Sequence, residues 1–171
     1  LAMGRTVLVA LDGSSHSLRA LRWYIENNQI AGDSLLLLFI SEPPSMMMSA
    51  GAATPEVYMR CKEEALTKAK QLAAEADSRC AEWGIRADVS KRFLERLHSG
   101  PGPTIVSVAN EESVDLIVMG SRGLGTLRRT FLGSVSDYVL HHAHKPCAII
   151  PPPAAAVAAS SAEATAATVP K

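Results

Sequence analysis

The sequence has no excess of charge of either sign. Its 171 residues include 17 lysines and arginines and 17 aspartates and glutamates, so the formal net charge is zero. A protein that binds nucleic acid or an acidic membrane through its overall charge carries a clear excess of basic residues. We therefore expect neither nucleic acid nor a membrane among its partners. The 47% of hydrophobic and 20% of charged residues are typical of a globular protein.

Cysteines and long apolar runs are also scarce. The three cysteines, Cys61, Cys80 and Cys147, are widely spaced and form no Cys-x-x-Cys pair. This pattern is typical of reduced thiols in an intracellular protein. No run approaches the roughly 20 apolar residues that a membrane-spanning helix needs. The N-terminal residues also do not combine the basic, apolar and small-residue segments of a secretory signal, so we expect a cytoplasmic protein.

Short apolar runs recur along the chain, and each is bounded by turn residues. Three of them, Arg5–Leu11, Leu35–Ile40 and Val114–Met119, predict strands of a sheet that is buried on both faces. Apolar and polar residues alternate over 85–89, which predicts another strand, at an edge of the sheet. Residues 146–150 predict the last strand, also at an edge.

Stretches with helical spacing of apolar residues separate these strands. We expect helices after Ser14, over about 56–83, after 100–103 and from near Ser134. Because strands that alternate with helices form parallel sheets with right-handed crossovers, the sequence predicts an α/β fold. We expect a doubly wound, Rossmann-like sheet of five parallel strands with helices on both faces. One domain would cover residues 4–151, and the alanine-, proline-, serine- and threonine-rich residues 152–171 would form a flexible tail.

A glycine-rich segment follows the fourth predicted strand. It reads Gly120-x2-Gly123-x9-Gly133-Ser134, and its last two residues begin a predicted helix. Glycines let the backbone approach a ligand closely, and the N-terminus of a helix favours an anion. The segment therefore predicts a phosphate-binding site. The alternative is that these glycines only form a turn.

Two common phosphate-binding motifs are absent. Gly-x-x-x-x-Gly-Lys-Ser/Thr occurs nowhere, which excludes a Walker-type NTPase. A dinucleotide-binding domain carries Gly-x-Gly-x-x-Gly after its first strand, where this chain has residues 12–15, Asp-Gly-Ser-Ser. We therefore do not expect NAD as a cofactor.

The glycine spacing resembles that of ATP-binding members of the universal stress protein family, as does Asp12 at the end of the first strand. The resemblance covers about residues 4–151 and implies an adenine-nucleotide α-hydrolase-like fold. It also implies a regulatory protein that binds ATP, with or without Mg²⁺, and acts in stress responses through conformation or partners. In this family the fifth strand pairs with its two-fold mate, so a homodimer is implied.

The resemblance assigns a role to individual residues. Asp12 would accept hydrogen bonds from the ribose hydroxyls, the first-strand turn and Ile40 would flank the adenine, and the residues after the fourth strand would hold the ribose and phosphates. The implied nucleotide-binding residues are Leu11, Asp12, Gly13, Ile40, Met119, Gly120, Arg122, Gly123, Gly133, Ser134, Val135 and Ser136.

Several of these residues have a simpler explanation. Asp12 could cap the first helix, and Ser134 with Asp137 has the spacing of a capping box. Arg122 and the other arginines of the segment could be solvated. The histidines over 141–144 lack an acidic or cysteine partner nearby, so we expect no metal site.

Two alternatives to a regulatory binder remain open. One is a slow Mg²⁺-dependent ATPase or an adenylyl-transfer enzyme, although the sequence contains no evident catalytic residue and no lysine in the glycine-rich segment. The other is a dimeric interaction module whose nucleotide site is empty.

Overall fold

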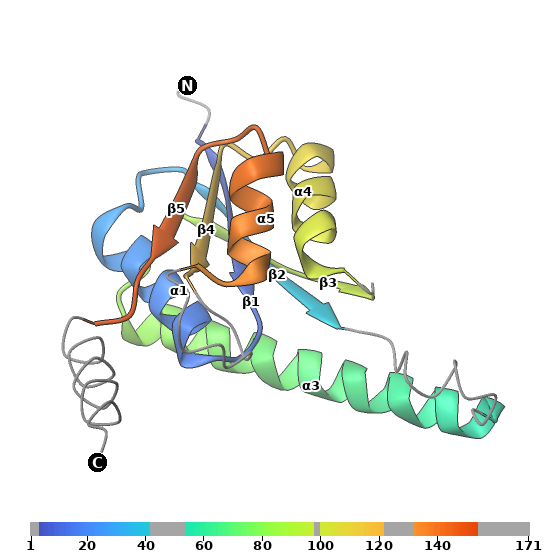
Figure 1. Cartoon of the computed structure of the whole chain (residues 1–171). Helices are drawn as coiled ribbons and strands as arrows, with labels where there is room; N and C mark the ends of the chain where they lie inside the picture. Colours follow the sequence, from blue (N-terminus) through green and yellow to red (C-terminus); the bar gives the residue numbers. More distant parts are fainter. Residues whose placement is uncertain (1–3, 42–53, 98–99, 122–131, 154–171) are drawn as a thin grey trace, which may run out of the picture.

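Strands and helices alternate along the chain, as the sequence predicts. The computed structural model describes residues 4–41, 54–97, 100–121 and 132–153. The elements, in chain order, are β1 (Thr6–Leu11), α1 (Ser15–Asn27), β2 (Ser34–Ser41), α3 (Pro55–Glu82), β3 (Ser90–Leu97), α4 (Pro101–Glu111), β4 (Leu116–Gly120), α5 (Ser134–His142) and β5 (Cys147–Ile150). The strands form one parallel sheet in the order β3-β2-β1-β4-β5, which confirms the predicted doubly wound α/β fold (Figure 1).

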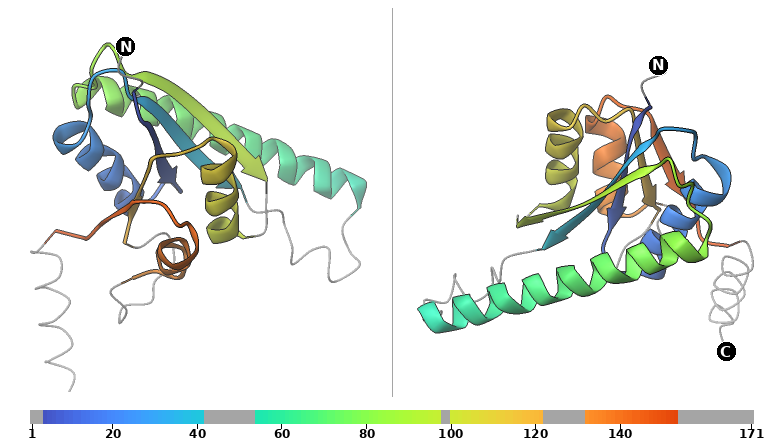
Figure 2. Two further views of the ribbon diagram at one scale, coloured as in Figure 1. Left: turned by 90° about the horizontal axis from the view of Figure 1, so that it is seen from above. Right: turned by 180° about the vertical axis from the view of Figure 1, so that it is seen from behind.

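Helices cover both faces of this sheet. Helices α1 and α3 pack on one face, with Val7, Val9 and Leu11 of β1. Helices α4 and α5 pack on the other face, against Leu8 of the same strand. Figure 2 shows the two helix layers from above and from behind. Because successive side chains of a strand point to opposite faces, the continuous apolar runs of β1 and β2 fill two separate cores.

The third strand lies later in the chain than we predicted. Residues 85–89 form the connection after α3, and β3 begins only at Ser90. The alternation there has another cause: Ile85 packs against the core, and the exposed side chains of Arg86 and Asp88 form an ion pair at 2.9 Å. The prediction of a strand over 85–89 is therefore wrong, whereas its position at an edge of the sheet is confirmed.

The sequence of β3 has the charged composition of a surface segment, not the apolar run of a buried strand. The strand reads Ser-Lys-Arg-Phe-Leu-Glu-Arg-Leu, with charged residues at half of its positions. Lys91 pairs with Asp77 of α3 on one face of the sheet, and Arg92 pairs with Glu112 beside α4 on the other. An edge strand that carries such charges is protected from pairing with a further chain.

Helix α3 is much longer than the strands it covers. At about 1.5 Å per residue, its 28 residues span roughly 42 Å. Ala69, Leu72, Ala76 and Cys80 are buried against the sheet, whereas none of the side chains described between 55 and 68 is buried. The amino-terminal half of α3 therefore extends beyond the sheet (Figure 1). No helix among the described ranges is long and apolar enough to cross a membrane.

Candidate functional site

The order of the strands reverses between β1 and β4. From β1 the chain adds β2 and β3 on one side, and it then returns to add β4 and β5 on the other. Val9 lies beside Val118, so the two strands end at the same level, at Leu11 and Gly120. In open α/β sheets ligands bind outside the carboxyl ends of the strands at such a reversal. This position is therefore the candidate site.

The turn after β1 brings Asp12 to this position. The Asp12 carboxylate accepts a hydrogen bond from the Ser14 N–H at 2.9 Å, and Gly13 adopts a φ of +80°, which favours glycine. Ser14 is the N-cap of α1, and its hydroxyl accepts from the Ser17 N–H at 3.2 Å. The alternative in which Asp12 caps this helix is therefore wrong, because Ser14 performs that role.

Gly120 allows β4 to end directly against the first turn of α1. A Cβ on Gly120 would lie 2.8 Å from the carbonyl oxygen of His16, closer than any side chain can approach. This close contact alone requires glycine at position 120, whether or not a ligand binds there. It also holds the ends of β1 and β4 against one helix, which fixes the geometry at the strand-order reversal; this candidate position outside the two strand ends is called the crevice below.

The start of α5 is tied to the end of β4 by hydrogen bonds. The Gly133 N–H donates to the Ser121 carbonyl at 2.7 Å. The Ser136 hydroxyl lies 2.9 Å from the carbonyl oxygen of Gly133 and 3.2 Å from that of Ser121. Since the first N–H groups of a helix lack intrahelical acceptors, those of residues 134–136 are suited to bind an anion beside β4.

The predicted capping box at this helix is wrong. Gly133 is the N-cap of α5, without a side-chain cap, and Ser134 is the first helical residue. Gly133 has φ −77° and ψ 157°, an extended conformation that any residue can adopt. The conformation of the chain at position 133 therefore does not require glycine.

The remaining predicted site residues differ in what they present to the crevice. The side chains of Leu11 and Met119 are buried, one in each core, so only their backbone can face a ligand. Ile40 and Val135 are half-buried and pack against the core on the α4 and α5 face. Arg122 and Gly123 lie outside the described residues, as do the other arginines of the glycine-rich segment.

The structure adds Ser121, which the sequence reasoning missed. Its hydroxyl is buried and has no hydrogen-bond partner among the described residues. The Ser121 backbone donates to the Ile150 carbonyl at 2.9 Å and accepts from Gly133, so the residue joins β4, β5 and α5. A buried hydroxyl without a partner costs free energy, which makes Ser121 a candidate ligand contact. The sequence did contain a signal for Ser121, namely its position directly after a predicted strand and a glycine.

Metal-binding side chains do not gather in the part of this site that the structure describes. Among the described residues, no three histidine, cysteine or acidic side chains are placed to hold one ion. The ring nitrogens of His141 and His142 contact backbone carbonyls of their own helix, at 2.8 and 2.7 Å. The Asp137 carboxylate also lies 3.7 Å from the His141 ring, one helical turn away, so the expectation that these histidines have no acidic neighbour is wrong. All three cysteines are free, and burial raises the pKa of the Cys80 thiol to about 11.

The model of the universal stress protein family matches residues 3–151. This chain belongs to the universal stress protein family. The universal stress protein in the QAH/OAS sulfhydrylase 3′ region of Thermus aquaticus is 31% identical over 148 residues, 86% of this chain and 98% of the relative. A universal stress protein of Mycolicibacterium smegmatis is 26% identical over 148 residues, 84% of this chain, but the match spans only 47% of the relative.

Solved structures share the fold of this universal stress protein. The structure of the hypothetical protein MJ0577 has a TM-score of 0.72 and 22% identity, and the match covers 89% of this chain and 99% of that one. A universal stress protein family protein from Arabidopsis thaliana, with AMP bound, has a TM-score of 0.60 and 20% identity and covers 89% and 94% of the two chains. At such identities the likeness shows the fold alone.

Proposed function

We propose that this universal stress protein binds an adenine nucleotide, ATP in particular, in the crevice between the ends of β1 and β4. The observation that carries the proposal is the hydrogen bond from Gly133 to Ser121, at 2.7 Å, because it places the N-terminus of α5 beside the strand-order reversal. The family to which the chain belongs supports the proposal, as does the AMP bound to the Arabidopsis protein of the same fold.

The residues of the crevice suit the parts of a nucleotide. Asp12 would accept hydrogen bonds from the ribose hydroxyls, next to the turn at Gly13. The backbone N–H groups of Ser134, Val135 and Ser136 would bind the phosphates, as helix N-termini do. The Ser121 hydroxyl would donate a hydrogen bond to the ligand. Ile40 and the backbone of Leu11 would border the adenine, and Met119, Gly120, Arg122 and Gly123 would complete the site.

Gly133 would serve a steric purpose in this arrangement. Its φ of −77° gives no conformational reason for glycine. A hydrogen in place of a side chain would instead let the phosphates approach the backbone of the first turn of α5. Mg²⁺ would accompany the phosphates in solution, and the protein would act in the cytoplasm as a nucleotide-dependent regulator of stress responses, through its conformation or its partners.

The same proposal includes a homodimer. Strand β5 is an edge of the sheet, and its residues Cys147 to Ile149 are half-buried. An edge strand with apolar side chains and unpaired backbone groups is prone to pair with another chain. Pairing of β5 with its two-fold mate would cover it. A monomer mass by light scattering, at tens of micromolar protein, would contradict this part of the proposal.

The nucleotide itself can be identified directly. We expect mass spectrometry of the protein, purified gently and then denatured, to detect a released adenine nucleotide. Protein stripped of that ligand should bind ATP more tightly than GTP in calorimetry, because the proposed site borders the base. Stripped, folded protein that binds no adenine nucleotide would refute the proposed function. Phosphate release in a single turnover would instead favour an enzyme.

A further inference from the structure

A buried serine lies in the first turn of each helix that borders the strand-order reversal. Ser17 belongs to α1, which follows β1, and Ser136 belongs to α5, which follows β4. Each is the third residue after the N-cap of its helix, which is Ser14 in α1 and Gly133 in α5. Ser17 and Ser136 are only 4% and 3% exposed. The two serines therefore hold equivalent positions, one on each face of the sheet.

Ser17 ties the first turn of α1 to the residue that we propose binds the ribose. Its hydroxyl donates a hydrogen bond to the Ser14 carbonyl at 3.0 Å, and its oxygen accepts one from the Asp12 N–H at 3.3 Å. The Asp12 carboxylate in turn accepts from the Ser14 N–H at 2.9 Å. Asp12 is thus held through both its backbone and its carboxylate. Ser17 therefore limits the directions in which this carboxylate can point.

Ser136 ties the first turn of α5 to the end of β4. Its hydroxyl oxygen lies 2.9 Å from the carbonyl oxygen of Gly133 and 3.2 Å from that of Ser121, the first residue after β4. Because a carbonyl oxygen can only accept, the hydroxyl proton is directed to these two atoms and not to a ligand. The Ser121 carbonyl also accepts from the Gly133 N–H at 2.7 Å. Two donors at the start of α5 therefore converge on one atom at the end of β4.

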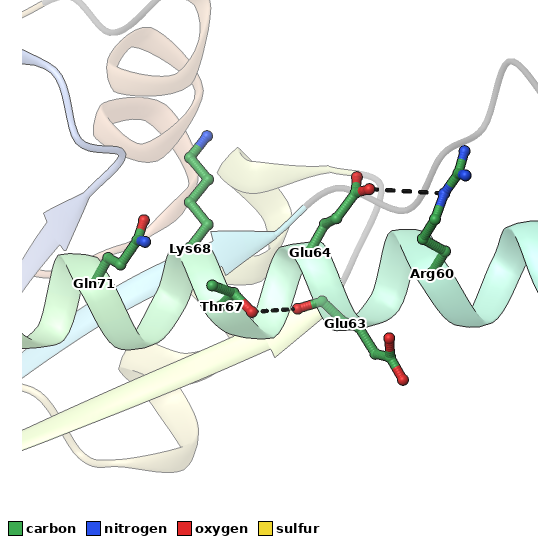
Figure 3. A pocket seen from close by; sticks show the side chains of 6 residues that line it. All are labelled: Arg60, Glu63, Glu64, Thr67, Lys68 and Gln71. Atoms are coloured by element: carbon green, nitrogen blue, oxygen red, sulfur yellow. Dashed lines mark hydrogen bonds and ion pairs between the residues drawn. The ribbon is translucent and has the colours of Figure 1, made fainter.

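Other hydroxyls show that a serine or threonine in a helix does not in general make such a tie. The Thr67 hydroxyl donates to the Glu63 carbonyl, one turn earlier in α3, at 2.8 Å, beside a shallow hollow on the surface of that helix (Figure 3). The buried Thr104 hydroxyl, near the start of α4, donates to the Gly100 carbonyl at 2.7 Å, also one turn earlier. Both bonds are local, as is usual for these side chains in helices, whereas the two serines reach the end of a strand.

We infer that Ser17 and Ser136 are positioning residues, and that each holds one half of the nucleotide site. The inference rests on the proposed function. Ser17 holds the Asp12 carboxylate in place for the ribose, and Ser136 holds the backbone N–H groups at the start of α5 in place for the phosphates. Groups that are fixed before binding lose less conformational freedom when the ligand arrives. Because the ribose and the phosphates are different parts of the ligand, the two serines should affect different ligands.

Calorimetry with ATP and with adenosine on full-length variants tests this division. Ser17→Ala should weaken the binding of both ligands about threefold to tenfold, the scale of one hydrogen bond, because both ligands contain the ribose. Ser136→Ala should weaken ATP binding by a similar factor but leave adenosine binding unchanged. Thr104→Val is the matched control, because it removes a buried hydroxyl near the start of α4, which follows the edge strand β3. It should bind both ligands like the parent.

A double variant shows whether Ser17 acts through Asp12. Asp12→Ala alone removes the contact with the ribose, so adding Ser17→Ala to it should not weaken ATP binding further. A general structural role of Ser17 would instead add a loss of its own. Urea unfolding of each variant verifies that folded proteins are compared.

The outcomes separate this inference from the proposed function. If the parent binds both ligands and either serine variant binds them equally well, the inference is wrong and the proposed function stands. Equal losses for ATP and adenosine in Ser136→Ala would also overturn it, because Ser136 would then not act on the phosphates alone. A further loss of ATP affinity in the double variant would overturn the role of Ser17. If the parent binds neither ligand, the proposed function itself fails.

Discussion

The two ends of the sheet use buried polar groups in opposite ways. At the amino-terminal end, the fully buried Asp33 carboxylate accepts hydrogen bonds from Arg5, from the Tyr24 hydroxyl at 2.8 Å and from the Ile30 N–H at 3.1 Å. At the carboxyl end, the buried Ser121 hydroxyl has no partner among the described residues. The first arrangement stabilises the fold, and the second leaves hydrogen-bonding capacity for a ligand.

The charge of Asp33 makes the amino-terminal end the more vulnerable to substitution. Asp33→Asn keeps the shape of the side chain but leaves the partly buried Arg5 without its counterion. We expect the free energy of unfolding to fall by about 2–4 kcal/mol, the scale for breaking a buried ion pair. Urea unfolding measures this change. ATP affinity of the folded variant should not change, and a parent-like unfolding free energy would contradict the assigned role of Asp33.

Asp12, at the carboxyl end, should affect binding rather than folding. Removing its hydrogen bonds to the ribose in Asp12→Ala should cost about 1.5–3 kcal/mol, or roughly 10- to 150-fold in affinity for both ATP and adenosine.

A matched control for Asp12 lies at the other end of the sheet. The Asp115 carboxylate also accepts a backbone hydrogen bond, from Thr6 at 2.8 Å, but lies at the start of β4. Asp115→Ala should bind both ligands like the parent. If the two alanine variants lose the same affinity, the effect is one of general stability and Asp12 has no special role.

The Asp33 network should also make stability depend on acid pH. Burial opposes ionisation, but hydrogen bonds from Arg5, Ile30 and Tyr24 outweigh it and lower the pKa of Asp33. Its contribution is therefore complete above the unfolded-state pKa of about 4 and is lost as the pH falls through the lower folded-state value. Urea unfolding at a series of pH values measures this dependence. The difference in the free energy of unfolding between the parent and Asp33→Asn should disappear below pH 4. A difference that stays constant down to pH 2 would contradict this linkage.

The smallest effect concerns one hydrogen bond of that network. Tyr24→Phe removes the hydroxyl that donates to Asp33 but keeps the buried ring. Because Arg5 and Ile30 still satisfy the carboxylate, we expect a loss of about 1 kcal/mol in the free energy of unfolding. Thermal unfolding followed by circular dichroism is sufficient to detect it. A loss as large as that of Asp33→Asn would mean that Tyr24, not Arg5, is the main partner.

The sequence predicted most of the fold because its signals were local. Apolar runs with turn residues located β1, β2 and β4, and the long stripe of apolar residues located α3 to within a residue or so. The prediction of the third strand was wrong, because Lys91 and Arg92 of β3 pair with side chains distant in sequence. Single-sequence patterns do not reveal such tertiary pairs.

The candidate site was predicted in part, for a similar reason. The strand ends and glycine spacing pointed to the crevice, but three features depend on tertiary contacts. These are the close approach of Gly120 to His16, the buried hydroxyl of Ser121 that has no partner among the described residues, and the position of Leu72 of α3 beside the β1 turn. Each arises where elements far apart in the chain meet.

The most direct test of the central claim is calorimetry of Gly133→Val with ATP and with adenosine. The extended conformation at position 133 accepts valine, so the variant should fold, which circular dichroism verifies. If the phosphates of ATP contact the backbone at the start of α5, the branched side chain should weaken ATP binding at least about tenfold, or about 1.4 kcal/mol, and leave adenosine binding nearly unchanged. A folded Gly133→Val that binds ATP as tightly as the parent would contradict the claim.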